Sequence, residues 1–491
     1  MPNNQNSYRQ IMKATSLFGG VQVINIFIQI IRSKIVAVLL GPAGMGIMGL
    51  LNSTLSLIKS SSDFGLGVSA VQDIALANKT NDNYRIGKTV TIVRRLVWIT
   101  GTLGTLIVLV LSPWLSELAF GNKEFTISFI WISITLLFQQ LSTGQFVILQ
   151  GMRKMQLLAK ANVLGSALGL IFTLPFYYIY GVQGIVPGII GTALIVLFLS
   201  WYFSRKIIIE KVDISYSQTI TGGEKMLKMG FMISLSSLLA IGASYILRIF
   251  INKTGGIDQV GLYDAGFMII NTYVGLVFTA MSTDYFPRLS SVSESNKLCR
   301  RIIIQQAEIA ILILAPILVV FLIFIKQIVI LLYSSQFIDV NQMIYWAALG
   351  MFFKATTWAI GYILLAKSES KIFFFSELVA NIYTLLLNVL GYYYYGLEGL
   401  GISFLVSYII SLIQVFLIAN IRYKFTFNSS FMKIFLIQFS IAILSFIVIY
   451  LLPQPHVFVV GIFMIIFSCW YSFRELDNRI NFKQILSKKR K

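Results

Sequence analysis

Two short stretches, YGVQG at residues 180–184 and YGLEG at residues 395–399, share one glycine-rich pattern and stand 215 residues apart. Self-similarity at a fixed period marks a repeated structural unit, and many transporters are built from such repeats. The chain is therefore predicted to contain two copies of one helical bundle. The same offset relates three further pairs: Lys13 with Lys228, Gly46 with Gly261 and, within one residue, Arg32 with Arg248.

The composition is that of a membrane protein. The 491 residues are 57% hydrophobic and 12% charged, with a mean hydropathy of +0.81, whereas soluble domains average about 25% charged residues. Apolar stretches of about 20 residues recur along the chain, and each is long enough to cross a bilayer as a helix. We therefore predict an all-α polytopic membrane protein.

Catalytic and cofactor-binding signatures are missing from the sequence. Two cysteines and one histidine are too few for a disulfide framework or a histidine-based metal centre. No Walker A sequence is present, so ATP hydrolysis by this chain is not expected. We predict a transporter rather than an enzyme, with no catalytic residue, no metal site and no cofactor.

Fourteen spans are predicted from the apolar segments. The second and eighth are long, so a tilt, a break or an extension beyond the bilayer is expected there. The first contains polar residues and lacks a clean signal-peptide core, so it is expected to be retained as a span, and GPAG at residues 41–44 ends it. The spans are 15–40, 44–77, 88–112, 125–150, 157–180, 183–203, 227–251, 259–287, 302–325, 341–366, 372–395, 399–421, 432–452 and 456–473.

The basic residues gather on one side of the predicted membrane. Only Lys123, Lys253 and Lys326 fall in loops of the other side, so the positive-inside rule makes both termini cytoplasmic. The net charge of +20 is therefore mostly topogenic, and nucleic acid is excluded as a partner, although the terminal basic residues also suit anionic lipid headgroups. The basic side holds Arg9, Lys13 and the clusters at 79–95, 153–154, 205–225, 288–301, 367–371, 422–424 and 474–491.

Six spans in each copy make the repeat parallel, because an even number returns the chain to the same side. This predicts two parallel six-helix lobes around a central cavity, related by an axis along the membrane normal. The last two spans lie outside the repeat and form a two-helix hairpin. The predicted parts are an N-terminal lobe (1–210), a C-terminal lobe (211–425), accessory helices 13 and 14 (426–475) and a basic cytoplasmic tail (476–491).

One face of the first helix carries a polar stripe ending in an arginine. Such a stripe must face other helices or water, because acyl chains cannot solvate it. The seventh helix carries a weaker stripe that ends in Arg248, and guanidinium cannot neutralise itself by losing a proton. Paired arginines in a wet cavity suit a phosphate or pyrophosphate group, to which they form bidentate hydrogen bonds. The two stripes are Gln22, Asn25, Gln29 and Arg32, and Ser234, Ser237, Ser244 and Arg248.

Other ionisable residues lie at membrane depth, and several have simpler structural explanations. Lys59 and Asp63 could pair along their own helix, Lys34 could snorkel to the interface, and Asp284 and Glu308 could lie near the cytoplasmic surface. The predicted substrate-binding residues are Arg32, Arg248, Lys34, Lys59, Lys354, Gln22, Asn25, Gln29 and Asn271. The candidates for ion coupling are Asp63, Asp264, Asp284, Glu308 and Glu377.

Three stretches resemble a known family, the Wzx-type flippases of lipid-linked oligosaccharides. These flippases form the polysaccharide transporter branch of the multidrug/oligosaccharidyl-lipid/polysaccharide exporter superfamily. The similarity covers roughly residues 10–420 and is close to the enterobacterial common antigen lipid III flippase type. The stretches are KIVAVLLGPAGMG (34–46), VGLYDAGFMIINTYVGLVFTAMSTDYFPRL (260–289) and GYILLAKSESKIFFFSE (361–377).

The resemblance implies movement of an undecaprenyl-pyrophosphate-linked oligosaccharide from the inner to the outer leaflet of the bacterial plasma membrane. The cargo would be an O-antigen unit of lipopolysaccharide or another surface or capsular repeat unit. The resemblance also implies transport by alternating access, cationic residues in the cavity and coupling to an ion gradient. It further implies a polysaccharide polymerase and chain-length machinery as protein partners. Lys34, Arg248 and Glu377 fall in or beside the matching stretches, whereas Asn271 stands where that relative has an acid. The extra hairpin resembles the two added helices of the peptidoglycan lipid II flippase, which help to form a groove for the lipid tail.

Three alternatives remain open at this point. A cation-coupled multidrug exporter of the same superfamily would need acidic residues to dominate its cavity. A membrane-embedded glycan polymerase or ligase would need a large outward loop with catalytic residues, whereas the predicted outer loops are short. A scaffold for glycan assembly would leave the charges at membrane depth unexplained.

Overall fold

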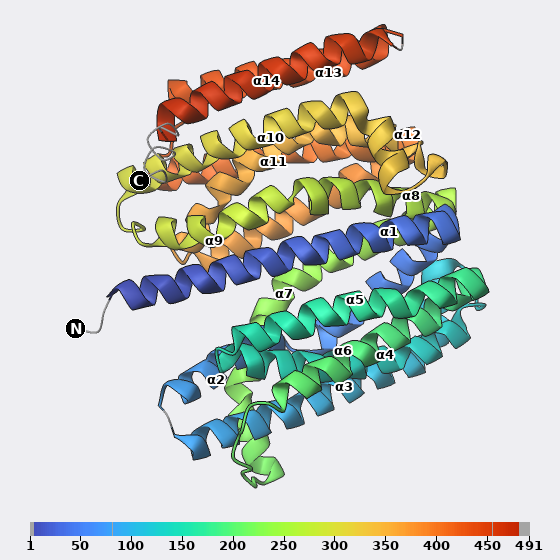
Figure 1. Cartoon of the computed structure of the whole chain (residues 1–491), viewed down its shortest axis with the longest axis vertical. Helices are drawn as coiled ribbons and strands as arrows, with labels where there is room; N and C mark the ends of the chain where they lie inside the picture. Colours follow the sequence, from blue (N-terminus) through green and yellow to red (C-terminus); the bar gives the residue numbers. More distant parts are fainter. Residues whose placement is uncertain (1–3, 81, 454, 481–491) are drawn as a thin grey trace, which may run out of the picture. The chain divides into compact units, whose positions relative to one another are not determined.

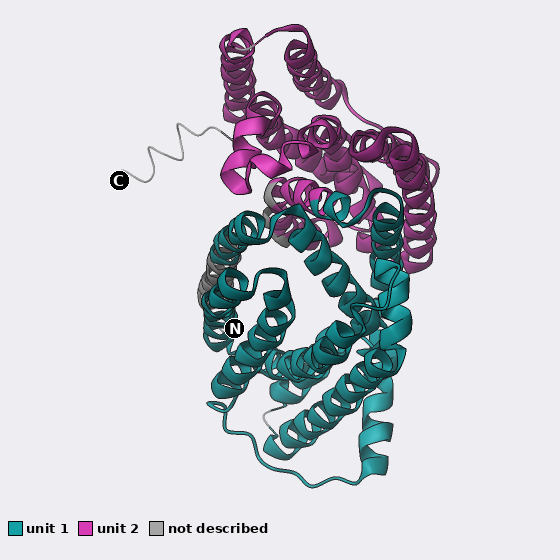
Figure 2. Ribbon diagram, turned by 90° about the vertical axis from the view of Figure 1, so that its right-hand side faces the viewer, with its two compact units in different colours: residues 1–261 teal, residues 262–491 magenta. Residues whose placement is uncertain are grey.

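The computed structural model describes residues 4–80, 82–453 and 455–480. Side chains before Ile24 lie outside this description, and so do residues 481–491, most of the predicted basic tail. The chain divides into two compact units, Met1–Gly261 and Leu262–Lys491, which Figure 2 colours teal and magenta. Every regular element within the described residues is helical.

The first unit holds the helices of the first repeat together with the seventh span. In it α3, α4, α5 and α6 run side by side (Figure 1). Side-chain caps fix several helix starts: the Asp82 carboxylate accepts the N–H groups of Tyr84 and Arg85, and Ser215 and Gln218 form a capping box at α7. The elements are α1 (Asn4–Ser62), α2 (Leu66–Lys79), α3 (Asn83–Phe120), α4 (Thr126–Gly151), α5 (Met155–Tyr180), a 3₁₀ turn (Gly181–Gly184), α6 (Ile185–Ser204), α7 (Tyr216–Gly255) and the start of α8 (Ile257–Met268).

The second unit continues from α8 to the end of the chain. Its last two helices, α13 and α14, pack against α10, and the predicted tail begins as the end of α14. After α8 the elements are a π-helical segment (Ile269–Val274), α9 (Leu276–Ser290), α10 (Asn296–Leu332), a 3₁₀ turn (Ser335–Phe337), α11 (Val340–Ala366), α12 (Ser370–Tyr423), α13 (Ser429–Leu451) and α14 (His456–Ile480).

Glycines at matching repeat positions break the helices in the same way. Gly181 (φ 53°, ψ −129°) and Gly396 (φ 58°, ψ −137°) are 215 residues apart. Gly41 (φ 65°, ψ −169°) and Gly256 (φ 85°, ψ 174°) keep the same offset. Positive φ with these ψ values is open almost only to glycine. The sequence repeat is therefore also a repeat of backbone geometry.

The spans follow from these breaks. Ten described helical stretches are long and apolar enough to cross a membrane. Three of them contain a break, at Gly41, Gly181 or Gly396, and so supply two segments each. The predicted seventh span, 227–251, lies within α7, which is not among the ten. All fourteen predicted segments thus fall on helices.

Both long predicted spans are interrupted, as expected. The second is broken between α1 and α2, where Phe64 and Gly65 have φ values of 48° and 62°. The eighth contains the π-helical segment between α8 and α9. Irregular backbone within a membrane-spanning segment is tolerated only inside protein or beside a wet cavity.

Two repeat-related glycines meet at the predicted outer end of the first unit. A Cβ built on Gly46 would overlap the carbonyl oxygen of Ile257, and one built on Gly261 would overlap that of Pro42. Each built Cβ would also lie 3.0 Å from the backbone nitrogen of the other glycine. Pro42 and Ile257 are themselves 215 residues apart. The contact is therefore reciprocal between residues at matching repeat positions.

The predicted lobe boundary at 210/211 differs from the boundary between the compact units. Helix α7 packs against α1, α2 and α3 in the first unit. The linker before it is also fastened there, because Arg95 donates to the carbonyl oxygen of Ile214 at 2.7 Å and to the Thr219 hydroxyl at 3.0 Å. The boundary between the compact units reflects which helices pack together, whereas the predicted lobe boundary reflects the sequence repeat. The division into two lobes therefore stays a prediction.

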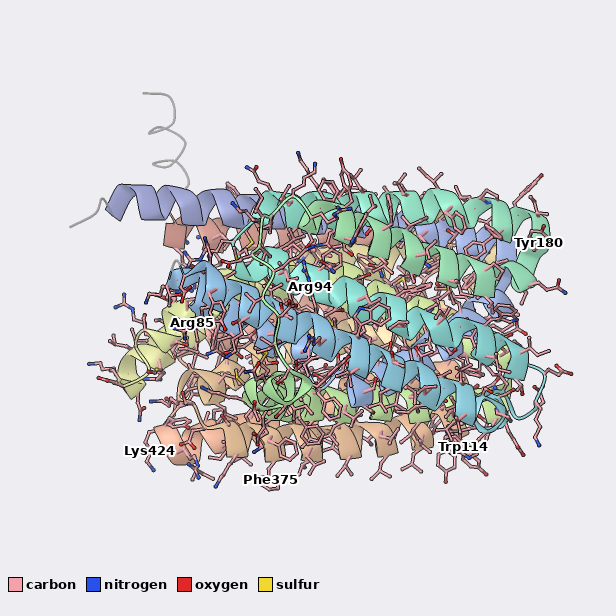
Figure 3. All side chains as sticks on the ribbon, turned by 90° about the horizontal axis from the view of Figure 1, so that it is seen from below. Arg85, Arg94, Trp114, Tyr180, Phe375 and Lys424 are labelled. Atoms are coloured by element: carbon pink, nitrogen blue, oxygen red, sulfur yellow. The ribbon has the colours of Figure 1, made fainter. Side chains whose placement is uncertain are left out.

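Side chains at the two ends of the first unit fit the predicted membrane orientation. Figure 3 shows Arg85 near one end of this unit, with Trp114 and Tyr180 towards the opposite end. The two aromatic side chains are 56% and 58% exposed. Interfacial aromatic residues and cytoplasmic basic residues are the usual markers of the two membrane surfaces.

Candidate functional site

Arg32 and Arg248 lie at matching depths in the first unit. Arg32 is nine residues before the break at Gly41, and Arg248 is eight residues before the break at Gly256. At 1.5 Å per residue, these positions are about 13 Å and about 12 Å from the outer turns. With the breaks at the predicted outer surface of a hydrocarbon core about 30 Å thick, both backbones would lie near its middle. Both side chains are half-buried.

The polar stripe of the first helix is turned away from its most exposed face. Ile24, Phe27 and Ile31 are 47%, 62% and 50% exposed, whereas Asn25 and Arg32 are half-buried. The side-chain oxygen of Asn25 is buried and has no hydrogen-bond partner within the described residues. The stripe therefore faces protein, as its polarity requires.

Gln29 is half-buried and lies on the same stripe, whereas Lys34, also half-buried, follows Phe27 by seven residues and so lies on the side of the exposed residues. The side chain of Gln22, the fourth predicted stripe residue, lies outside the described residues. On α7, Arg248 donates to both the carbonyl oxygen (3.2 Å) and the hydroxyl (2.5 Å) of Ser244. Two of the four predicted stripe residues of that helix, Ser244 and Arg248, thus share one face.

Asp63 sits where α1 ends and α2 begins. Its Oδ1 accepts the N–H of Gly65 at 2.9 Å, Lys59 lies one turn earlier, and Ser234 of α7 faces the carboxylate. Gly65 packs directly on the backbone of Gly230 in α7. A carboxylate at a broken helix is a usual arrangement for an ion or proton site.

The second unit contains a separate polar cluster around Lys354. The Lys354 ammonium of α11 donates to Oδ1 of Asn271 at 2.7 Å and lies 5.6 Å from the ring centre of Phe404 and 5.3 Å from that of Tyr408. Asn271 belongs to the π-helical segment and is exposed. Glu377 and Tyr408 lie near each other on the two segments of α12 that the break at Gly396 separates.

Two of the predicted coupling acids have arginine partners. Glu308 is 6% exposed, and its carboxylate accepts from Nε of Arg479 at 3.0 Å. Arg479 also donates to Glu475 and Ser430, so it joins α10 to both accessory helices. Asp284, whose side chain is 81% exposed, faces Arg288 one turn later at 3.8 Å. These partners favour the structural explanation for both acids, whereas Asp264 is half-buried on α8.

Several contacts of the candidate site were absent from the sequence predictions. The Phe404 and Tyr408 rings lie one turn apart, and this spacing could have flagged an aromatic face. The hydrogen bond between Thr54 and Tyr245 (3.1 Å) carries no such signal. Among the described residues, no three His, Cys, Asp or Glu side chains gather closely enough to hold a metal ion.

Comparison with known protein families identifies the family to which the chain belongs. A family model described as "Polysaccharide biosynthesis protein" matches residues 35–342. The chain belongs to this polysaccharide biosynthesis family. Two curated proteins named Lipid III flippase, from Escherichia coli (strain K12) and Shigella flexneri, are each 20% identical to this family member over 372 residues, which cover 75% of its chain and 88% of theirs.

Solved structures share the fold of this family member. The Lipid II flippase MurJ in an inward closed conformation aligns with a TM-score of 0.73 and 13% identity, covering 96% of this chain and 99% of the MurJ chain. An inward-facing multidrug resistance MATE transporter of the MOP superfamily aligns with a TM-score of 0.68 and 16% identity, covering 84% and 96%. These alignments confirm the predicted all-helical fold.

Proposed function

We propose that this protein is a flippase that moves a lipid-linked oligosaccharide across the membrane by alternating access. Its family, its similarity to the Lipid III flippases and its fold, shared with the Lipid II flippase MurJ, support a transporter rather than an enzyme. The observation that carries the proposal is the pair of arginines at matching depths on repeat-related helices. Paired guanidinium groups suit the phosphate oxygens of such a cargo.

The finer assignments belong to the same proposal. The carrier is undecaprenyl pyrophosphate, the glycan is an O-antigen or other surface or capsular repeat unit, and the membrane is the bacterial plasma membrane with both termini in the cytoplasm. Arg32 and Arg248 hold the pyrophosphate, with Asn25, Gln29, Lys34 and Lys59 in support. A polysaccharide polymerase and chain-length machinery are the proposed protein partners.

For ion coupling, we propose Asp63 and Glu377 ahead of Glu308 and Asp284, and Asp264 stays a candidate without a rank. Asp63 lies at a helix break and Glu377 beside an aromatic residue of the Lys354 cluster. Glu308 and Asp284 are engaged by arginines. An acid held in an ion pair is less free to exchange a proton during each cycle.

The multidrug exporters share the fold, and charge separates the two functions. The matched residues at mid-membrane depth in the first unit are arginines, which repel the cationic drugs that an acidic cavity would attract. This observation favours an anionic cargo.

The experiment is deletion of the gene followed by complementation. The deletion strain is expected to accumulate the lipid-linked glycan on the cytoplasmic leaflet, and the wild-type chain is expected to clear it. Arg32→Gln with Arg248→Gln should fail to clear it while inserting normally, and Lys123→Gln, a charge removed from a predicted outer loop, should behave as wild type. Clearance by the double arginine variant would contradict the assignment.

A further inference from the structure

Helices α4 and α11 carry the same tryptophan near their predicted outer ends, but in different surroundings. At the 215-residue offset α4 corresponds to α11, and Trp131 corresponds to Trp346. Trp346 is half-buried, whereas Trp131 is 63% exposed. Since the residue is the same in both copies, the difference must come from what covers it.

In the second unit, α13 covers this tryptophan. The Phe446 ring of α13 packs edge-on against Trp346, with ring centroids 4.7 Å apart. The Trp346 indole N–H donates to Oε1 of Glu398 at 2.8 Å, and the Tyr450 hydroxyl of α13 donates to Oε1 of Gln342 at 2.6 Å. The second repeat thus seats a helix here through aromatic contacts and hydrogen bonds.

In the first unit, the corresponding place is an open cavity. It lies between α4, α5 and α6, which run side by side (Figure 1), and has a volume of about 570 Å³. This is within the usual range for ligand pockets, about 300–1,000 Å³. Trp131 lines the cavity together with Gln183, the counterpart of Glu398. The rest of the wall is mostly apolar and includes Ile127, Phe172 and Ile190.

The cavity lies in the outer half of the predicted membrane region. Trp131 stands five residues after the start of α4 at Thr126, and Phe172 stands eight residues before the end of α5 at Tyr180. At 1.5 Å per residue, these positions are about 8 Å and about 12 Å from the predicted outer turns. One leaflet contributes about half of a hydrocarbon core about 30 Å thick, so acyl chains of the outer leaflet reach this depth.

The residues that seat a helix in the second repeat are replaced in the first. Ile127, which is 67% exposed, stands in the place of Gln342, and Ile130, which is 43% exposed, stands in the place of Tyr345. A helix docked like α13 would therefore lose its hydrogen bond and an aromatic contact. Every described residue that lines the cavity is uncharged. This surface suits a lipid chain better than a polar or charged partner.

We propose that the cavity binds one acyl chain of an outer-leaflet phospholipid, in the place that α13 takes in the second unit. The Trp131 indole N–H and the Gln183 amide, both at the outer end of the cavity, are donors for the ester carbonyl oxygens of that lipid. Tryptophan suits this position because its ring is apolar and its N–H needs a polar partner. The bound chain holds α4 against α5 and α6. The site is separate from the paired arginines.

The first test compares two tryptophans at similar depth. Two full-length variants each keep one of the seven tryptophans, Trp131 or Trp114, with phenylalanine at the other six positions. Trp114 is 56% exposed and stands six residues before the end of α3, about 9 Å. Phosphatidylethanolamine brominated on one acyl chain is titrated into detergent micelles, where bromine quenches the fluorescence of a tryptophan that it contacts.

Trp131 should be half-quenched at a lipid fraction roughly fivefold lower than Trp114, which is the ratio that one net hydrogen bond supplies. Gln183→Leu in the Trp131 variant removes the amide, leaves the cavity open and should reduce this difference. Equal quenching of Trp131 and Trp114 would mean that lipid contacts both at random, and would overturn the proposal.

The second test keeps all the tryptophans. Adding phosphatidylethanolamine should raise the melting temperature of the wild-type chain in detergent, because a ligand that binds only the folded state stabilises it. Ser128→Phe fills the cavity with a ring and should abolish this rise. Thr102→Phe adds the same ring at an exposed position of α3 and should preserve it. No rise in the wild-type chain, or an equal rise in Ser128→Phe, would contradict the site.

Two further measurements identify the occupant. Anionic phosphatidylglycerol with the same acyl chains should raise the melting temperature by the same amount, since no charged residue lines the described cavity. An effect of the anionic lipid alone would point to a headgroup site and overturn the acyl-chain proposal. Light scattering should give one oligomeric state for the wild-type chain and Ser128→Phe. A wild-type dimer that becomes a monomer in Ser128→Phe would assign the cavity to a second copy of the chain instead.

Discussion

The reciprocal contact between Gly46 and Gly261 leads to a prediction about conformational balance. In Gly46→Ala, the new methyl group would overlap the carbonyl oxygen of Ile257. The two backbones would have to separate by about 1 Å, and such overpacking costs about 1–3 kcal/mol. If the contact exists only while the outer side is closed, a penalty of this size shifts the closed-to-open equilibrium by roughly 5–150-fold.

The assay measures the reactivity of a cysteine placed eight residues after Gly46 on α1, at position 54. Thr54 is fully buried, and Thr54→Cys changes its volume little. In a background without Cys299 and Cys469, a membrane-impermeant maleimide added outside should label this cysteine faster once Gly46→Ala is present. The matched control is Gly361→Ala, because an added methyl there meets no atom within 4 Å. Equal labelling with and without Gly46→Ala would refute the reasoning.

Three further predictions concern the frame around the site. Glu308→Gln should lower the melting temperature in detergent by an amount equivalent to about 1–3 kcal/mol, because it leaves Arg479 without its buried partner. Glu308→Gln combined with Arg479→Gln should recover part of the loss. An unchanged melting temperature would contradict a stabilising role for the Glu308–Arg479 ion pair. Gly181→Ala and Gly396→Ala should each cost about 1–3 kcal/mol through backbone strain, because their φ and ψ values are open almost only to glycine, and markedly unequal costs would contradict the shared geometry. Cys299, which is fully buried, should resist maleimide in the folded protein and react after unfolding, and rapid labelling of folded protein would contradict its placement.

Local sequence signals predicted the fold well. The GPAG turn, the paired YGVQG and YGLEG stretches and the long second and eighth spans all fall where the backbone breaks. These features are local, since a glycine at positive φ or an apolar run of given length acts without distant partners. The predicted family and the predicted all-helical fold were both confirmed.

Partner choice was not predictable from the sequence. Glu308 and Arg479 are 171 residues apart, and Lys354 and Asn271 are 83 apart. Each ionisable residue at membrane depth had several possible partners, and only three-dimensional packing selects one. The sequence therefore supplied a list of candidate residues, while the structure shows the arginine partners of Glu308 and Asp284 and the contacts of Lys354.

The most direct test of the central claim is the flipping rate of a lipid-linked oligosaccharide by the purified chain in proteoliposomes. The account predicts that the wild-type chain exposes the glycan on the opposite leaflet and that Arg32→Gln with Arg248→Gln reduces this rate by at least about a hundredfold, since two charge-assisted contacts are lost. A wild-type rate no greater than that of protein-free vesicles, or a double variant as fast as the wild type, would contradict it.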